Sequence, residues 1–138
     1  MRKPLLALFL AAFALGCGKD GSQPSFGDLH HVKGVVKQGG QPVRLGVVTF
    51  TLDPAKPEFH TNAIVGQDGS YSLTTVRTTD KSGERKTGAP AGTYKVTYVP
   101  DLSDQTAGGS QDSIAATKPV TVAAGENDIP IDLPAAKR

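Results

Sequence analysis

Beyond residue 30, hydrophobic and polar side chains alternate in short runs separated by glycine, proline and aspartate. A period of two residues is typical of β-strands that bury one face, because successive side chains point to opposite sides. The clearest run is 92–99, where Tyr94, Val96 and Tyr98 share one face and polar residues occupy the other. We expect these three side chains to face a hydrophobic core.

Similar runs divide most of the chain into predicted strands. Seven strands are expected, at 31–37, 46–52, 59–65, 71–76, 92–99, 119–122 and 129–133. The dipeptide Asp68-Gly69 predicts a hairpin between its flanking strands, and the last two strands are expected to form another hairpin across 124–127. Pro130 marks the final strand as an edge strand, because proline has no N–H to donate to a neighbour.

Two polar stretches, 77–91 and 101–117, interrupt these strands and are predicted to be long loops. No segment after the first 16 residues keeps the helical period of about 3.6 residues. Many short strands with frequent turn signals indicate two packed sheets. The sequence therefore predicts an all-β fold, a seven-stranded antiparallel β-sandwich that follows an N-terminal signal helix.

The first 16 residues differ from the rest of the chain. Arg2 and Lys3 precede an 11-residue apolar run at 5–15, and Gly16 then comes before the only cysteine, Cys17. A positive start, an apolar core and a small residue are the three parts of a secretory signal. The apolar run is too short to span a bilayer as a permanent helix. The sequence predicts that the remainder of the chain is exported.

Residues 14–17, Ala-Leu-Gly-Cys, resemble the lipobox of bacterial lipoproteins, with the leucine one position nearer the cysteine than in the consensus. The resemblance implies a diacylglycerol thioether on Cys17, cleavage before it, and acylation of the new amine by a fatty acid such as palmitate. Two or more acyl chains hold a protein firmly on a bilayer. Two alternatives remain open: an incidental Cys17 beside an ordinary cleavage site, and a leader retained as an anchor.

These observations predict four segments: a signal peptide at 1–16, the acylated cysteine and a flexible tether at 17–29, a β-sandwich at 30–134 and a tail at 135–138. The tether is expected to be flexible because it is polar, rich in glycine and without periodicity. Gly18, rather than aspartate, follows Cys17. In the enterobacterial sorting pattern this favours the periplasmic face of the outer membrane.

Charge and cysteine content exclude several classes of function. The chain has 15 Lys and Arg against 13 Asp and Glu, and two of the basic residues lie in the leader. A mature chain with balanced charge has no electrostatic reason to bind nucleic acid. A single cysteine excludes an intramolecular disulfide.

Histidines, acids and serines offer no recognisable site. His30 and His31 are adjacent, so a strand would point them to opposite faces, and His60 is distant in the sequence. The acids of the 101–117 stretch are too widely spaced for a compact calcium loop; they are Asp101, Asp104 and Asp112. Four serines lack the Gly-x-Ser-x-Gly context of a nucleophile; they are Ser70, Ser72, Ser103 and Ser113. We expect no catalytic residue, no metal and no cofactor.

Three segments carry a resemblance to small transthyretin-like, or prealbumin-like, sandwiches, in particular the carboxypeptidase regulatory-like group. They are the opening strands with their turn at 32–50, the motif Asp-Gly-Ser-Tyr-Ser-Leu at 68–73, and Pro-Ala-Gly-Thr-Tyr-Lys-Val at 90–96. The resemblance covers about 32–133. Small lipoproteins of planctomycete type combine such a body with such a leader, which suggests that lineage.

The resemblance also defines alternatives. Transthyretin-like folds include a 5-hydroxyisourate hydrolase that ends in Tyr-Arg-Gly-Ser, whereas this chain ends in Lys137-Arg138. Cna-B-like sandwiches form a Lys–Asn isopeptide bond, for which Lys33 or Lys37 with Asn127 would be the candidates. We therefore expect a noncatalytic binding or structural lipoprotein whose loops meet an envelope protein or glycan. A transthyretin-like hydrolase and assembly through an edge strand remain the alternatives.

Overall fold

A computed structural model of the protein describes residues 23–101 and 112–136; the leader, Cys17 and the start of the tether lie outside these ranges. Its strands are β1 (Leu29–His30), β2 (Val32–Gln38), β3 (Gln41–Pro42), β4 (Val47–Leu52), β5 (Phe59–Ile64), β6 (Ser70–Ser72), β7 (Thr74–Arg77), β8 (Arg85–Thr87), β9 (Ala89–Pro90), β10 (Gly92–Val99), β11 (Ile114–Ala115), β12 (Val120–Val122), β13 (Asn127–Asp128) and β14 (Ile131–Leu133). The described residues form no helix, so none of them contributes a helix long and apolar enough to cross a bilayer.

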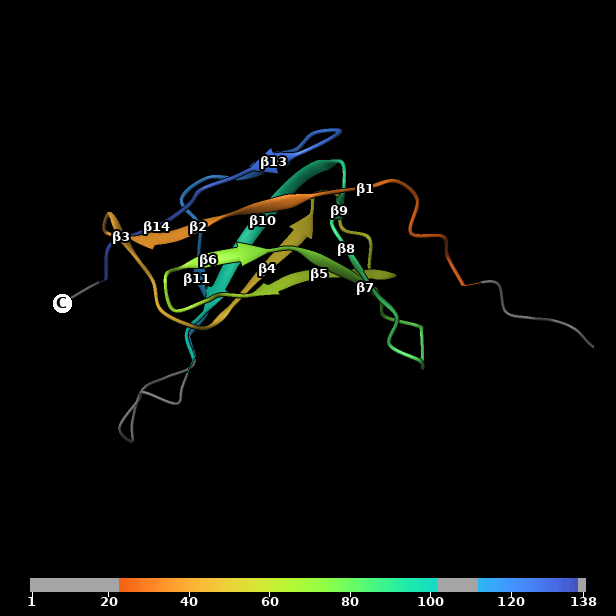
Figure 1. Ribbon diagram of the computed structural model, residues 1–138, viewed down its shortest axis with the longest axis horizontal. Helices are drawn as coiled ribbons and strands as arrows, with labels where there is room; N and C mark the ends of the chain where they lie inside the picture. The colour runs from red at the N-terminus through yellow and green to blue at the C-terminus, as the bar shows by residue number, and fades with distance from the viewer. Residues whose placement is uncertain (1–22, 102–111, 137–138) are drawn as a thin grey trace, which may run out of the picture.

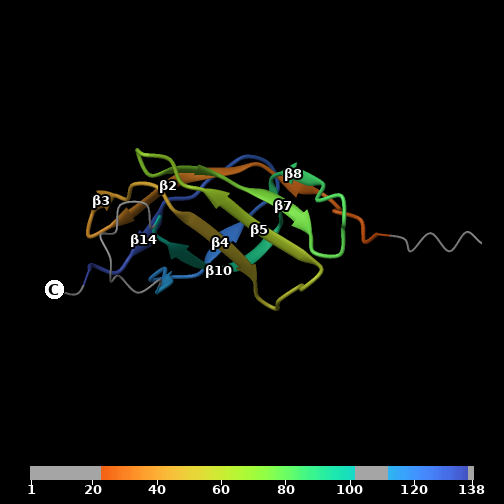
Figure 2. The ribbon, with the colours of Figure 1, turned by 90° about the horizontal axis from the view of Figure 1, so that it is seen from below.

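The larger sheet has the strand order β11-β10-β4-β5-β7-β8, with β12 also paired to β10. Its longest ladder joins β10 and β4 antiparallel, with Val96 opposite Phe50. The alternating pattern of 92–99 predicts the strand β10, and Tyr94, Val96 and Tyr98 are all buried as expected. Figure 2 shows β10, β4, β5 and β7 side by side across this layer.

The second sheet is built around β2. β3 and β6 pair with it antiparallel, and β13 and β14 pair with it parallel. The parallel pairs keep one register, from Asn127 opposite Val32 to Leu133 opposite Gln38. β13 and β14 are therefore one edge line that is interrupted at residues 129–130. A small third pair joins β1 to β9.

The chain passes between the two layers at Leu73. β6 pairs with β2 of the second sheet, whereas β7 pairs with β5 of the larger sheet. The Leu73 N–H donates to the Val32 carbonyl at 2.9 Å, and the Leu73 carbonyl accepts from the Gly88 N–H at 2.8 Å. Leu73 is fully buried. Its backbone is thus hydrogen-bonded to both Val32 and Gly88 while its side chain packs in the core between the layers.

The core lies between the sheets and draws side chains from both. Phe50 of the larger sheet contacts Tyr71 of the second sheet, with ring centroids 5.8 Å apart, and Tyr94 at the same separation. The buried apolar side chains of the core are Val32, Val36, Val43, Val48, Phe50, Ala63, Val65, Tyr71, Leu73, Ala89, Tyr94, Val96, Tyr98, Val122, Ile131 and Leu133. The two-layer all-β fold predicted from the alternation is thus what the described residues form.

The core tyrosines satisfy their hydroxyls with backbone carbonyls. Tyr71 donates to the carbonyl of Ile129 at 2.6 Å and Tyr94 to that of Pro90 at 2.7 Å. Tyr98 donates to the carbonyl of Leu45. Burial raises the pKa of Tyr94 to about 12, and burial, followed by the nearby carboxylate of Asp128, raises the pKa of Tyr71 further.

Several predicted strands are confirmed, and the Asp68-Gly69 turn is present. Gly66 donates to the Ser70 carbonyl at 2.8 Å across that turn, and β5 and β7 pair antiparallel on either side of it. The final strand, β14, is an edge strand as expected, but Pro130 lies in the interruption before it and not within it. Asp128, Pro130 and Asp132 are exposed.

Other predictions are wrong. The segments 119–122 and 129–133 do not form a hairpin, because β12 pairs with β10 and β14 pairs with β2. The sandwich is not wholly antiparallel, since β13 and β14 run parallel to β2. The expected seven strands are divided further among the described residues, where the 77–91 stretch contains β8 and β9 and the 101–117 stretch contains β11.

Candidate functional site

The sandwich has two dissimilar ends. At one, which we call the tether end, residues 23 and 24 contact Thr79 and Arg77, and Thr78 donates to the carbonyls of Pro57 and Glu58. At the other, which we call the far end, lie the β2–β3 turn at 39–40, the turn at 67–69 and residues 134–136. Figure 1 shows the chain arriving beside β1, β7 and β8 and leaving at the opposite end, beside β3 and β14.

Phe26 is the centre of a charged and aromatic cluster at the tether end. Phe26 is 7% exposed. The Arg77 guanidinium lies over it, 4.4 Å from the ring centroid, and the Lys86 ammonium lies 5.0 Å from the same centroid. The Phe59 ring lies 5.9 Å away, centroid to centroid. Cations over an aromatic face are attracted by its quadrupole, so both basic residues hold this ring in place.

The backbone before Phe26 is bound to the same hairpin. Arg77 Nη1 donates to the Pro24 carbonyl at 3.2 Å. The side chains of Gln23 and Thr79 are joined by a 3.0 Å hydrogen bond, and Gln23 Nε2 also donates to the Thr79 carbonyl at 3.5 Å. We call residues 23–26 together with the β7–β8 hairpin, 77–86, the clasp.

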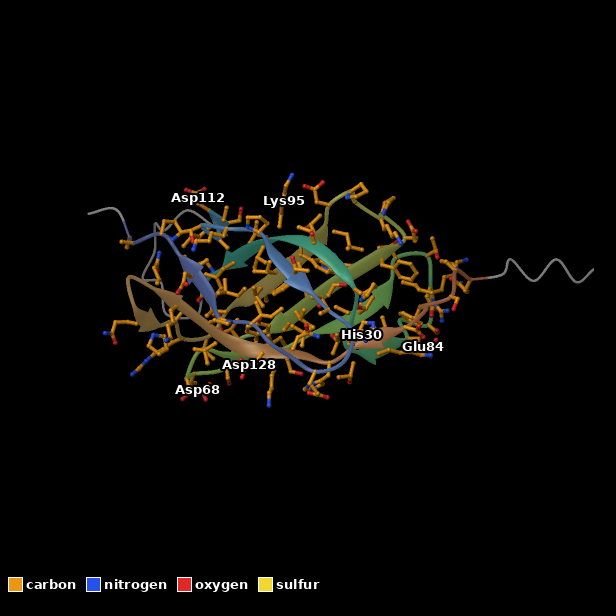
Figure 3. All side chains as sticks on the ribbon, turned by 90° about the horizontal axis from the view of Figure 1, so that it is seen from above. His30, Asp68, Glu84, Lys95, Asp112 and Asp128 are labelled. Atoms are coloured by element: carbon orange, nitrogen blue, oxygen red, sulfur yellow. The ribbon has the colours of Figure 1, made fainter. Side chains whose placement is uncertain are left out.

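Acidic residues of the hairpin hold the Arg77 guanidinium in position. It forms an ion pair with Asp80 at 3.3 Å and a second, shorter one with Glu84. Glu84 also lies 3.6 Å from the Lys86 ammonium. Hydrogen bonds from Ser82, and then the Arg77 charge, lower the pKa of Asp80. Figure 3 labels Glu84 at this end of the sandwich.

The clasp corrects the predicted tether. Residues 17–29 were expected to be a flexible tether, but 23–29 lie against the sandwich through Phe26 and the pairing of β1 with β9. The stretch 77–91, predicted to be a loop, is the hairpin that receives them. One aromatic residue in a polar segment was the available sequence signal, and periodicity alone misses it.

The histidines organise a turn. His31 Nδ1 lies 2.9 Å from the Glu126 carboxylate, and the Gly125 N–H donates to His30 Nδ1 at 3.1 Å. His60 is exposed on β5. Within the described ranges, no three His, Cys, Asp or Glu side chains gather where they would bind a metal ion.

Asn127, a candidate for an isopeptide bond, has a different role. Its Nδ2 donates to the carbonyls of Ala123 at 2.9 Å and Gly125 at 3.1 Å. Its Oδ1 accepts from the Ala123 N–H at 2.9 Å. Because the amide closes the 123–127 turn and Lys33 is exposed, the arrangement is that of a structural turn residue.

Among residues 23–101 and 112–136, the candidate acids and serines do not converge on a reactive centre. Ser70 donates its hydroxyl to Asp68 at 2.5 Å, inside the 67–70 turn, and this bond lowers the pKa of Asp68. Asp101 and Asp112 are described and exposed. Asp104 and Ser103 lie outside the described residues, as does Cys17.

The two ends differ in their surfaces. A cavity of about 190 Å³ at the tether end is lined by Phe50, Phe59, His60, Thr78 and Tyr94, among others. The far end carries an exposed apolar surface on the outer face of the larger sheet. Its most prominent member, Ile64, is 81% exposed beside Val47, which is 37% exposed.

The fold and this surface define an all-β domain of two packed sheets, with a polar clasp at one end. No protein family profile matches the sequence, and no curated protein matches it either. Among solved structures, the chain is similar to a DUF3823 family protein from Parabacteroides merdae ATCC 43184, with 16% sequence identity and a TM-score of 0.45. The similarity covers 75% of this chain and 45% of that one, so the chain spans less than half of its neighbour's length.

Proposed function

We propose that this protein is an exported bacterial lipoprotein, anchored by acyl chains on Cys17, whose β-sandwich is a noncatalytic binding or structural module of the cell envelope. The observation that carries the proposal is the position of the only cysteine, directly after an 11-residue apolar run with a basic start. The sandwich is proposed to be of the transthyretin-like, carboxypeptidase regulatory-like class. The proposed location is the periplasmic face of the outer membrane.

The chemistry of the described residues supports a noncatalytic role. General acid–base or nucleophilic catalysis needs two or more reactive groups within hydrogen-bond reach and open to a substrate. The histidines at 30 and 31 bind a turn, and Ser70 and Asp68 bind each other within another turn. The tyrosines with raised pKa values donate to backbone carbonyls in the core. Each of these groups has a structural explanation.

The two long loops, 77–91 and 101–117, are expected to present the binding surface, but part of the first one contacts the chain itself. The hairpin at 77–86 is occupied by residues 23–26. A partner, an envelope protein or a glycan, then meets the far end of the sandwich more readily than the tether end. Exposed Ile64 and Val47 lie there, and apolar surface of this kind marks interaction sites when it is contiguous.

The test uses the full-length chain expressed in a bacterium with a lipoprotein pathway. The wild type is expected in the membrane fraction, partitioning into the detergent phase, with an N-terminal peptide whose mass includes a diacylglycerol and a third acyl group. Cys17→Ser should lose the added mass, the incorporation of labelled palmitate and the detergent partitioning. Ser22→Ala, in the same segment, should behave as the wild type. A Cys17→Ser protein that matures and partitions unchanged would contradict the anchor.

A further inference from the structure

The clasp connects the anchored segment to one particular end of the sandwich. We infer that it fixes the orientation of the domain on the membrane, with the tether end held next to the bilayer and the far end presented away from it. This inference rests on the proposed acylation of Cys17. It adds that the β7–β8 hairpin is the membrane-facing surface rather than a partner-binding loop.

The length of chain between the anchor and the clasp limits the separation. Six residues lead from Cys17 to Gln23, whose side chain is bound to Thr79. An extended chain spans at most about 3.6 Å per residue, so the clasp lies within about 22 Å of the anchored cysteine. Without the clasp, the first strand residue is Leu29, and twelve residues would reach about 43 Å. Closing the clasp therefore halves the reach of the tether.

The sandwich is long enough for this limit to distinguish its ends. β10 runs the length of the larger sheet in eight residues, Gly92–Val99. At about 3.3 Å per residue, the two ends are about 26 Å apart. The turn at 67–69 lies at the far end, whereas Lys81 lies in the turn of the clasp hairpin. When the domain stands on its tether end, the 67–69 turn lies about 26 Å farther from the bilayer than the tether end does.

The clasp is held by several independent kinds of contact between residues 23–26 and the 77–86 hairpin. Phe26 is buried between two cations and a second ring. Arg77 binds the Pro24 carbonyl while Asp80 and Glu84 bind Arg77. Gln23 is bound through its side chain. Side chain, backbone and ion-pair contacts all join the same two segments.

The composition of the chain offers a clean reporter, because it contains no tryptophan. Lys81→Trp at the tether end and Gln67→Trp at the far end are matched substitutions of exposed turn residues. Each acylated protein is reconstituted into vesicles that contain a headgroup-labelled lipid as energy acceptor. With the ends about 26 Å apart, we expect energy transfer from position 81 to exceed that from position 67 by about fivefold or more.

Two changes should remove this difference. Phe26→Ala, made in each reporter protein, opens the clasp, and it should lower transfer from position 81 at least about twofold as the reach of the tether doubles. Asp28→Ala, an exposed residue of the same segment, should leave transfer unchanged. Insertion of six Gly and Ser residues between Cys17 and Gln23 should act like Phe26→Ala without touching the sandwich, which covers the case in which Phe26→Ala fails to fold.

Equal transfer from the two positions, or a difference that persists through both changes, would overturn the inference. Failure of the anchor is separable from failure of the orientation. The mature chain from residue 17 contains every core residue, and its Cys17 can be coupled to a maleimide lipid in the same vesicles. If cellular acylation is absent but the coupled protein shows the difference, the proposed function fails and the orientation stands. If acylation is present without the difference, the orientation alone fails.

Discussion

The core and the clasp both centre on aromatic rings, but the rings are held in different ways. In the core, Tyr71 and Tyr94 pack on Phe50 and donate their hydroxyls to backbone carbonyls. In the clasp, Phe26 is held by the charges of Arg77 and Lys86 at the surface. Core packing is dispersive and desolvated, whereas the clasp depends on partly exposed charges that salt screens.

The core and the clasp therefore have different roles: the core stabilises the fold, and the clasp sets the position of the sandwich relative to Cys17. The core determines whether the two sheets form at all, because its side chains come from both of them. The clasp adds residues 23–26 to a sandwich whose core cluster does not include Phe26, so its contribution to folding is smaller than that of the core. Its effect is on how far the sandwich lies from Cys17. Changes in the core should therefore lower stability most, and changes in the clasp should alter geometry with a smaller loss of stability.

The largest effect is expected for Leu73→Ala. Leu73 is fully buried at the crossing between the layers, and truncation of a buried leucine costs about 2–5 kcal/mol of unfolding free energy, because it loses contacts and leaves a cavity. Val47→Ala, a truncation of a partly exposed side chain on β4, is the control and should cost about 0.5 kcal/mol or less. Chemical denaturation of both variants checks the ranking. Equal losses would show that the crossing is not the centre of the core.

A second large effect is expected for Gly34→Ala on β2. A Cβ at this position would lie 2.1 Å from the Ile129 carbonyl oxygen and 3.0 Å from the Tyr71 ring. The backbone at 129 must move, which costs about 1–3 kcal/mol or more by overpacking. It also disturbs the hydrogen bond from Tyr71 to Ile129. Lys33→Ala, on the neighbouring exposed position, should change the denaturation midpoint little.

Alkaline pH tests the core tyrosines. Burial raises the pKa of Tyr94 from 10.0 to about 12, and burial also raises the pKa values of Tyr71 and Tyr98. The unfolded chain then loses these protons at lower pH than the folded one. The stability contribution is present below pH 10 and, for Tyr94, is lost as the pH rises through about 12.

The expected measurement is a falling denaturation midpoint from pH 10 upward. Tyr94→Phe should lose about 1 kcal/mol at neutral pH, because its hydrogen bond to Pro90 is removed. The same variant should decline less steeply with pH. A decline as steep as in the wild type would mean that Tyr94 ionises as easily in the folded protein as in the unfolded one.

The sequence predicts strands well where one face is buried and the other exposed. The side chains of Tyr94, Val96 and Tyr98 alternate with polar residues, and their burial follows from that period alone. The partner of a strand is a different matter. The segment 129–133 has a clear apolar face, but its parallel pairing with β2 joins residues 95 apart in the chain. Local pattern does not contain that information, so the hairpin prediction failed.

Charged and short strands were missed for a related reason. β8 reads Arg-Lys-Thr and is exposed throughout, so it carries no apolar signal and the sequence predicts a loop there. Lys86 acts instead through its charge on Phe26. The predicted anchor residue, Cys17, lies outside the described residues, so its acylation remains a prediction from the sequence. The clasp depends on contacts between residues 53 apart, Pro24 and Arg77, which only the fold brings together.

A smaller effect on stability is expected for Phe26→Ala. Phe26 is 7% exposed but lies outside the core cluster, so its truncation loses apolar burial as well as the cation–π contacts and should cost about 1.5–3 kcal/mol. The melting temperature should fall by less than in Leu73→Ala. Limited proteolysis should nevertheless cleave between residues 23 and 29 faster than in the wild type, while the sandwich stays intact. Phe26→Tyr, which keeps the ring, is the matched control. Loss of cooperative unfolding in Phe26→Ala would place Phe26 in the core and end the distinction between the two regions.

The smallest effect on stability is expected for Ile64→Asn at the far end. Ile64 is 81% exposed, and surface substitutions outside caps, turns and ion pairs change stability by about 0.5 kcal/mol or less. If the exposed apolar surface around Ile64 and Val47 binds a partner, the same substitution should weaken that interaction. The amide that replaces the Ile64 side chain would lose its water in the contact, and this desolvation costs free energy. Thr49→Ser, on the same face of β4, is the control for a general effect of the outer sheet surface. A large fall in stability for Ile64→Asn would mean that this side chain is packed against the sandwich. That result would contradict the proposal that the far end is the partner-binding surface.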